Sequence, residues 1–102
     1  MQLNNHSYVH KQIRALCFAF EQATGLKLVT NLDNDFNSIR FASTYSYVTI
    51  DYLHNTYFLM CIKLNKTQFA IAQDIMLYLC WLHTGEQVNE LLVTIKQNKK
   101  KE

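Results

Sequence analysis

The stretch YSYVTIDYLHNTYFLMCIKL, residues 45–64, decides the fold, because it contains two long strands joined by a short turn. Both halves are rich in aromatic and β-branched residues, which suit a pleated, partly buried surface. We expect a three-residue turn at residues 54–56. A one-residue change in register would exchange the two faces of the sheet. The expected turn gives one apolar face that consists of Val48, Ile50, Tyr52, Phe58, Met60 and Ile62.

The opposite face of this strand pair is unusually rich in tyrosine. If helices cover only the first face, as is common in α+β domains, these rings face water. Rigid tyrosine rings are enriched in protein interfaces, although aromatic residues in strands also serve simple packing. We predict a partner-binding surface on this face, with two aspartates from the preceding turn as its rim. The predicted residues are Tyr45, Tyr47, Tyr57, Leu59, Asp33 and Asp35.

The residues before this pair predict a helix and two shorter strands. Ser7 is the expected N-cap of the helix and Gly25 its left-handed C-terminal stop. The strands are expected at residues 26–30 and 38–43, with a polar turn between them. The expected buried stripe of the helix is Val9, Ile13, Leu16, Phe20 and Ala23.

The residues after the strand pair return to helical periodicity. Asn65 or Thr67 is the expected N-cap, and residues 75–83 are apolar almost all round, so this helix must be contacted on more than one side. Thr84 and Gln87 match a capping box that predicts a last helix ending in lysines. The predicted fold is therefore α+β, with an N-terminal helix, an antiparallel meander of three to four strands, and two C-terminal helices on one sheet face.

The chain of 102 residues is long enough for a single compact domain, expected at residues 1–102. Its content of 49% hydrophobic and 18% charged residues is typical of a folded protein rather than a disordered one. The cysteines Cys17, Cys61 and Cys80 lie in apolar runs, which predicts free buried thiols in a reducing compartment. With no signal-peptide pattern at the start, we expect a cytoplasmic protein.

The net charge of +2 is unevenly distributed along the chain. Residues 96–102 form an expected basic tail, open to fraying, whose four lysines and one glutamate give +3, which leaves −1 for residues 1–95. A nearly neutral body argues against a dedicated nucleic-acid binder. Nucleic-acid binding by the tyrosine face stays the alternative prediction. It would use the cations Arg40, Lys63, Lys99, Lys100 and Lys101.

The polar turn and the residues after it have the alternating oxygen side chains of a calcium loop, in Asn31, Asp33, Asp35 and Asn37. Phe36 stands where such a loop needs glycine, and Ala42 stands where it needs the bidentate glutamate. Asparagine and aspartate are also common turn residues. We therefore expect no calcium site.

Two residue pairs have a spacing that occurs in metal sites: His6 with His10, and Cys80 with His83. Neither pair is accompanied by a second pair at zinc-site spacing. The sequence also contains no glycine-rich phosphate loop and no nucleophile elbow. We expect no metal, no cofactor and no enzymatic activity.

These features together predict a small non-enzymatic module that binds another protein, or a second copy of itself, stoichiometrically. The composition is rich in Asn, Lys, Ile, Tyr and Phe and poor in Gly, Pro, Ala and Arg, which is typical of AT-rich genomes. This favours a bacterium, phage or mobile element as the source. The expected role is an inhibitor or regulator of a host system, such as a defence system.

Overall fold

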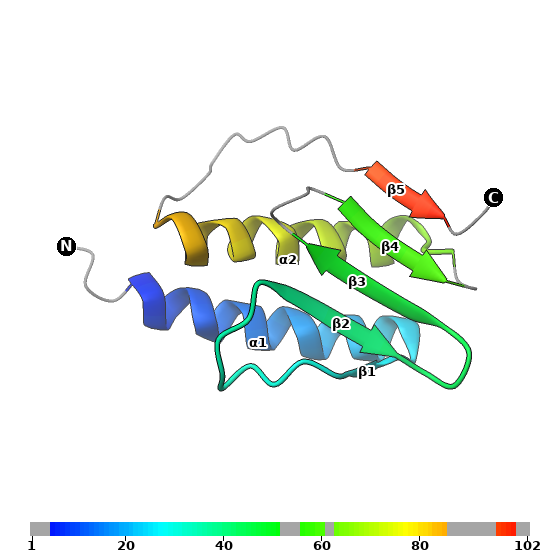
Figure 1. Ribbon diagram of the computed structural model, residues 1–102, viewed down its shortest axis with the longest axis horizontal. Coiled ribbons are helices and arrows are strands. Elements are labelled where there is room, and N and C mark those ends of the chain that lie inside the picture. The colour runs from blue at the N-terminus through cyan, green and yellow to red at the C-terminus, as the bar shows by residue number, and fades with distance from the viewer. Residues whose placement is uncertain (1–4, 52–55, 61–62, 86–95, 100–102) are drawn as a thin grey trace.

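The fold has two layers, a mixed sheet and a pair of helices. The computed structural model describes residues 5–51, 56–60, 63–85 and 96–99. Strands β1 to β4 pair antiparallel in chain order, and β5 pairs parallel to β4 at the edge. Figure 1 shows the central strands β2 and β3 crossing in front of the helices. The order of helices and strands confirms the α+β class. The elements are α1 (Asn5–Thr24), β1 (Lys27–Leu28), β2 (Ser38–Ala42), β3 (Tyr47–Asp51), β4 (Thr56–Met60), α2 (Lys66–Thr84) and β5 (Lys96–Lys99).

An N-cap at Ser7 would start the helix at Tyr8, but α1 already starts at Asn5, so the prediction of Ser7 as its N-cap is wrong. Its C-terminal stop is confirmed, because Gly25 has a φ of 81° and its N–H donates to the carbonyl oxygen of Glu21 at 2.8 Å. The hydroxyl of Thr24 donates to the carbonyl of Phe20 and accepts from the N–H of Leu26. These bonds fix the exit of the chain from α1 into β1.

Helix α2 begins with a complete capping box. The Asn65 side chain accepts from the N–H of Gln68 at 2.8 Å, and the Gln68 side chain accepts from the N–H of Asn65 at 2.9 Å. The same Gln68 amide donates to the carbonyl of Ala23 at 2.7 Å. One side chain therefore caps α2 and connects its start to the end of α1.

The C-terminal region differs from the predicted pair of helices. Thr84 does not begin a new helix; it is the last residue of α2, which stops at Gly85 with a φ of 78°. Residues 86–95, where the last helix was expected, lie outside the described residues. Lys96 to Lys99 form strand β5 instead of a helix end. Because β4 and β5 are parallel, α2 lies on the crossover between them, as parallel pairing requires.

The core lies between the sheet and both helices, and its members come from every layer. Its centre is the tilted ring pair of Phe20 and Phe41, with centroids 4.6 Å apart and both side chains fully buried. The predicted α1 stripe is partly wrong, because Cys17 is buried whereas Ala23 is exposed. The buried positions of the helices and the central strands are Val9, Ile13, Cys17, Phe20, Ile39, Phe41, Val48, Ile50, Ala72, Ile75, Met76, Leu79 and Trp81.

The predicted register between β3 and β4 is wrong. The structure pairs Val48 with Leu59 and Ile50 with Tyr57, so the connection is four residues long, 52–55, instead of three. Directly opposite residues of an antiparallel pair share a face. Positions 57 and 59 therefore share the face of buried Val48 and Ile50, and positions 58 and 60 share the other. Every residue from Tyr57 to Met60 is apolar or aromatic, so alternation could not set the register.

Strand β1 forms one edge of the sheet, and α1 protects it. The N–H of Leu28 donates to a carboxylate oxygen of Glu21 at 2.7 Å. Unpaired edge groups are a template for adding a foreign strand, and natural proteins cover such edges. Glu21 therefore occupies a donor that an incoming strand would need.

Candidate functional site

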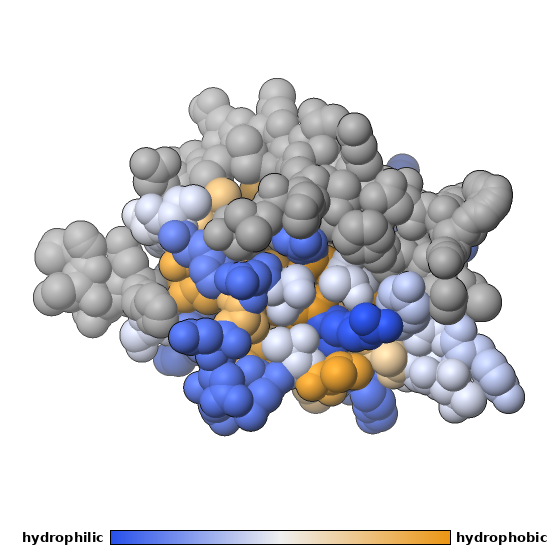
Figure 2. Space-filling model, in the orientation of Figure 1, coloured by the Kyte–Doolittle hydropathy of each residue, from blue (hydrophilic) through white to orange (hydrophobic). Residues whose placement is uncertain are grey.

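The candidate site is the sheet surface opposite the helices, which we call the outer face. On β1 to β3 it consists of the positions that alternate with buried residues. The coloured part of Figure 2 shows polar and pale residues interrupting the apolar ones on this side, without a continuous apolar patch. The outer face is thus suited to a mixed polar and aromatic contact. Its residues are Lys27, Ser38, Arg40, Ala42, Tyr47, Thr49 and Asp51.

Arg40 and Tyr47 form the best-defined contact on the outer face. The guanidinium carbon of Arg40 lies 4.1 Å from the centroid of the Tyr47 ring, which is a cation–π contact. The backbone of Arg40 is held on the β1 side, since its carbonyl accepts from the N–H of Val29 and its N–H donates to the hydroxyl of Thr30. A rigid backbone and a stacked side chain together preorganise the guanidinium of Arg40.

Thr49 is the direct cross-strand neighbour of Arg40. Its hydroxyl oxygen is buried and has no hydrogen-bond partner. A buried hydroxyl without a partner costs free energy, on the order of 1–3 kcal/mol, and such groups in native proteins often have a functional reason. The Thr49 hydroxyl is therefore an unfavourable buried group beside Arg40 and is not accessible to a partner.

The outer face carries its cations on β1 and β2 and its carboxylate at the end of β3. Lys27 and Arg40 are exposed cations on β1 and β2, and Lys27 pairs with Ala42 two residues from Arg40. Asp51 ends β3 on the other side of Thr49, opposite Ser38. Among the described residues there is one ion pair, between Arg14 and Asp33, and no carboxylate pairs with Arg40. The Arg40 end of the face is therefore positive.

The predicted interface residues do not all gather on the outer face. Tyr47 lies there, and Tyr45 lies in the adjoining β2–β3 turn with 81% of its surface exposed. Tyr57 and Leu59 occupy register positions opposite Ile50 and Val48, so their assignment to the outer face is wrong.

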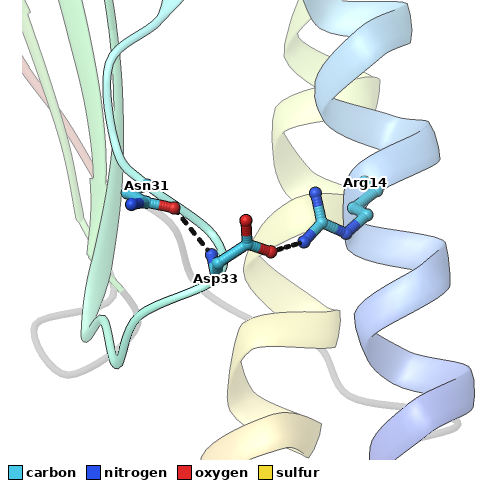
Figure 3. Close-up of polar contacts among 3 residues, drawn as sticks. All are labelled: Arg14, Asn31 and Asp33. Atoms are coloured by element: carbon cyan, nitrogen blue, oxygen red, sulfur yellow. Dashed lines mark hydrogen bonds and ion pairs between the residues drawn. The ribbon is translucent and has the colours of Figure 1, made fainter.

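The predicted acidic rim lies beside the helices instead of the outer face. Figure 3 shows Asp33 directed at α1, where its carboxylate accepts from the guanidinium of Arg14. The side chain of Asn31 accepts from the N–H of Asp33 at 2.9 Å, which makes an Asx turn. These contacts explain the alternating polar residues as turn chemistry. Within the described ranges, no three His, Cys, Asp or Glu side chains gather to hold a metal ion.

The cations of the alternative nucleic-acid prediction are dispersed. Arg40 lies on the outer face, and Lys63 is exposed after β4. Lys99 is the last residue of β5, paired with Leu59 in register, while Lys100 and Lys101 lie outside the described residues. Strands β2 and β3 therefore carry no arginine or lysine besides Arg40.

A shallow hollow of about 160 Å³ lies between the polar turn and the helix ends. Phe36 lines it, with its ring 5.8 Å from that of His10 and 6.2 Å from that of His83. Asp35 also lines it, which places the second predicted rim residue away from the outer face. We assign the hollow a packing role, because Phe36 is itself a buried core residue.

The described thiols have different surroundings. Burial, and secondarily the charge of Glu21, raises the pKa of Cys17 to about 12. Cys17 is therefore a protonated thiol at neutral pH and not an activated nucleophile. Cys80 is partly exposed, and Cys61 lies outside the described residues.

An aromatic cluster joins the two helices away from the outer face. The Trp81 ring lies 5.7 Å from those of Tyr8 and Tyr78, and its buried indole N–H has no hydrogen-bond partner. Burial raises the pKa of Tyr78, and the hydrogen bond with Tyr8 adds to this. Partial burial also raises the pKa of Asp74. The only indication of this helix–helix contact in the sequence was that residues 75–83 are apolar almost all round.

Comparison of the chain with protein-family models, curated proteins and solved structures gives no match. Among the helices in the described ranges, none has the length and apolar character needed to cross a membrane. The candidate site therefore depends on the geometry of the outer face alone.

Proposed function

We propose that this protein is a stoichiometric binding module that contacts another protein through its outer face. The observation that carries the proposal is the exposed Arg40 guanidinium stacked on Tyr47. Arginine and tyrosine are the residue types most enriched at the energetic centres of protein interfaces. Tyr45, highly exposed in the adjoining turn, extends the same contact area.

Binding through the face is favoured over strand addition at the β1 edge. Glu21 already occupies the N–H of Leu28, so an added strand would have to displace a buried-edge hydrogen bond. Cys17 is no candidate nucleophile, because its raised pKa leaves the thiol protonated at neutral pH. Inhibition or regulation of a host system, such as a defence system, is the role that such a compact module would serve.

The first experiment compares capture of proteins from a lysate of the source cells by three immobilised forms. These are the wild type, the double variant Arg40→Ala/Tyr47→Ala, and the control Arg14→Ala/Phe18→Ala. The control removes the other arginine and an aromatic ring that is 62% exposed on α1. We expect the wild type and the control to retain the same partner, and the double variant to retain at least about tenfold less, as loss of an interface centre implies.

Equal retention by all three forms would refute the outer face as the interface. Sedimentation of the purified wild type tests the case in which the partner is a second copy. In that case the double variant must become monomeric while the control stays dimeric. Equal melting temperatures of the three forms exclude unfolding as the cause.

The alternative, nucleic-acid binding, makes a different prediction with the same variants. Phosphate contacts release counterions, so binding of labelled single-stranded or duplex DNA and RNA would weaken steeply between about 50 and 200 mM salt. Fluorescence anisotropy at both salt concentrations measures this. We expect no salt-sensitive nucleic-acid binding. Tight binding that is lost with Arg40→Ala would replace the protein-interface proposal.

A further inference from the structure

We propose that the partner presents an acidic side chain, whose carboxylate is bound by Arg40 on its Tyr47 platform. This inference rests on the proposed function and specifies the chemistry of the partner. The starting observation is the orientation of Arg40, which lies over a ring 4.1 Å away. A guanidinium stacked on an aromatic face keeps the N–H groups at its edge available for bidentate bonds to a carboxylate.

The immediate surroundings favour an anion at this point of the face. Lys27 is exposed on the same face, on the side of β2 away from Asp51. Within the described ranges, the one ion pair belongs to Arg14 and Asp33, so no described carboxylate neutralises Arg40. On the other side of β2 from Lys27, the cross-strand neighbour of Arg40 is the uncharged Thr49, so that position adds no negative charge beside the guanidinium.

The far end of the outer face argues for a protein ligand instead of a nucleic acid. Asp51 lies on this face two residues from Thr49, so the face is not uniformly basic along its length, whereas a nucleic acid presents phosphates of a single sign. A protein surface can place a carboxylate at Arg40 and a neutral or basic group near Asp51. Charge complementarity of this kind fixes the orientation of a partner.

The test uses a hexaglutamate peptide with blocked ends as the probe, titrated into ¹⁵N-labelled protein at about 50 mM salt. We expect the largest amide shifts at Arg40, Tyr47 and Thr49. Arg40→Ala should weaken binding about tenfold or more, and Arg40→Lys at least several-fold, because lysine keeps the charge but loses the planar, stacked fork. The matched control Arg14→Lys should bind like the wild type.

Two results would overturn the inference even if hexaglutamate binds. One is equal binding by Arg40→Lys and the wild type, which means that charge alone is sensed. The other is tighter binding of a decathymidylate oligonucleotide than of hexaglutamate at the same residues. If hexaglutamate fails to bind while Arg40→Ala/Tyr47→Ala still loses the captured partner, only the acidic-partner inference fails. If the partner is retained as well, the proposed function fails with it.

Discussion

Replacement of Phe41 by alanine is expected to lower the free energy of unfolding by about 3–5 kcal/mol. Phe41 is fully buried on β2, and its ring packs 4.6 Å from that of Phe20 on α1. Its removal leaves a cavity between the two layers and breaks this ring pair. Because a small domain has only about 5–15 kcal/mol of stability, the variant should be close to unfolding at 37 °C.

Urea denaturation followed by circular dichroism measures the loss, and Phe18→Ala is the matched control. Phe18 is also a phenylalanine and lies on α1, but 62% of its surface is exposed. Its truncation should change the free energy of unfolding by less than about 0.5 kcal/mol. Similar losses of unfolding free energy in the two variants would contradict the placement of the core between the sheet and the helices.

Replacement of Ile50 by aspartate should prevent folding. Ile50 is fully buried on β3, on the face covered by the helices. A carboxylate placed there has no partner, and burying an unpaired charge costs several kcal/mol even after protein relaxation. We expect a flat urea profile and loss of the dispersed amide spectrum at neutral pH.

The adjacent position provides the control, because Thr49 points to the other face of the same strand. Thr49→Val keeps the shape of the side chain and removes its unpaired hydroxyl. This variant should be as stable as the wild type or slightly more stable, since no hydrogen bond is lost. A well-folded Ile50→Asp, or a strongly destabilised Thr49→Val, would show that the two faces of β3 are assigned the wrong way round.

Much of this architecture could be predicted from local sequence signals. Gly25 was predicted to end α1, and Asn65 was one of the two residues expected to cap α2, because such signals depend on a few adjacent residues. Alternation identified Val48 and Ile50 as core residues of β3. The two-layer arrangement then followed from amphipathic elements that must bury one side.

The failures have a common physical origin in contacts between distant segments. Strand β5 could not be predicted, since KQNK has little strand propensity and its pairing with β4 depends on the backbone of another segment. The β3–β4 register was wrong because residues 57–60 lack a polar alternation. That error placed Tyr57 and Leu59 on the outer face.

The candidate site was predicted only in part for the same reason. Tyr47 was identified as an outer-face residue, but its partner Arg40 was assigned only to the alternative nucleic-acid prediction. The pair becomes evident once the β2–β3 register sets Arg40 opposite Thr49. Asp33 could not be placed either, because its contact with Arg14 joins residues 19 positions apart.

Cross-saturation NMR on the complex with the captured partner tests the central claim most directly. Labelled protein is observed while the unlabelled partner is irradiated, so amides at the interface lose intensity. We predict losses at Arg40, Tyr47 and Thr49, with no loss at Arg14 and Phe18 on α1. Losses concentrated at Arg14 and Phe18, with the outer face unaffected, would contradict the account.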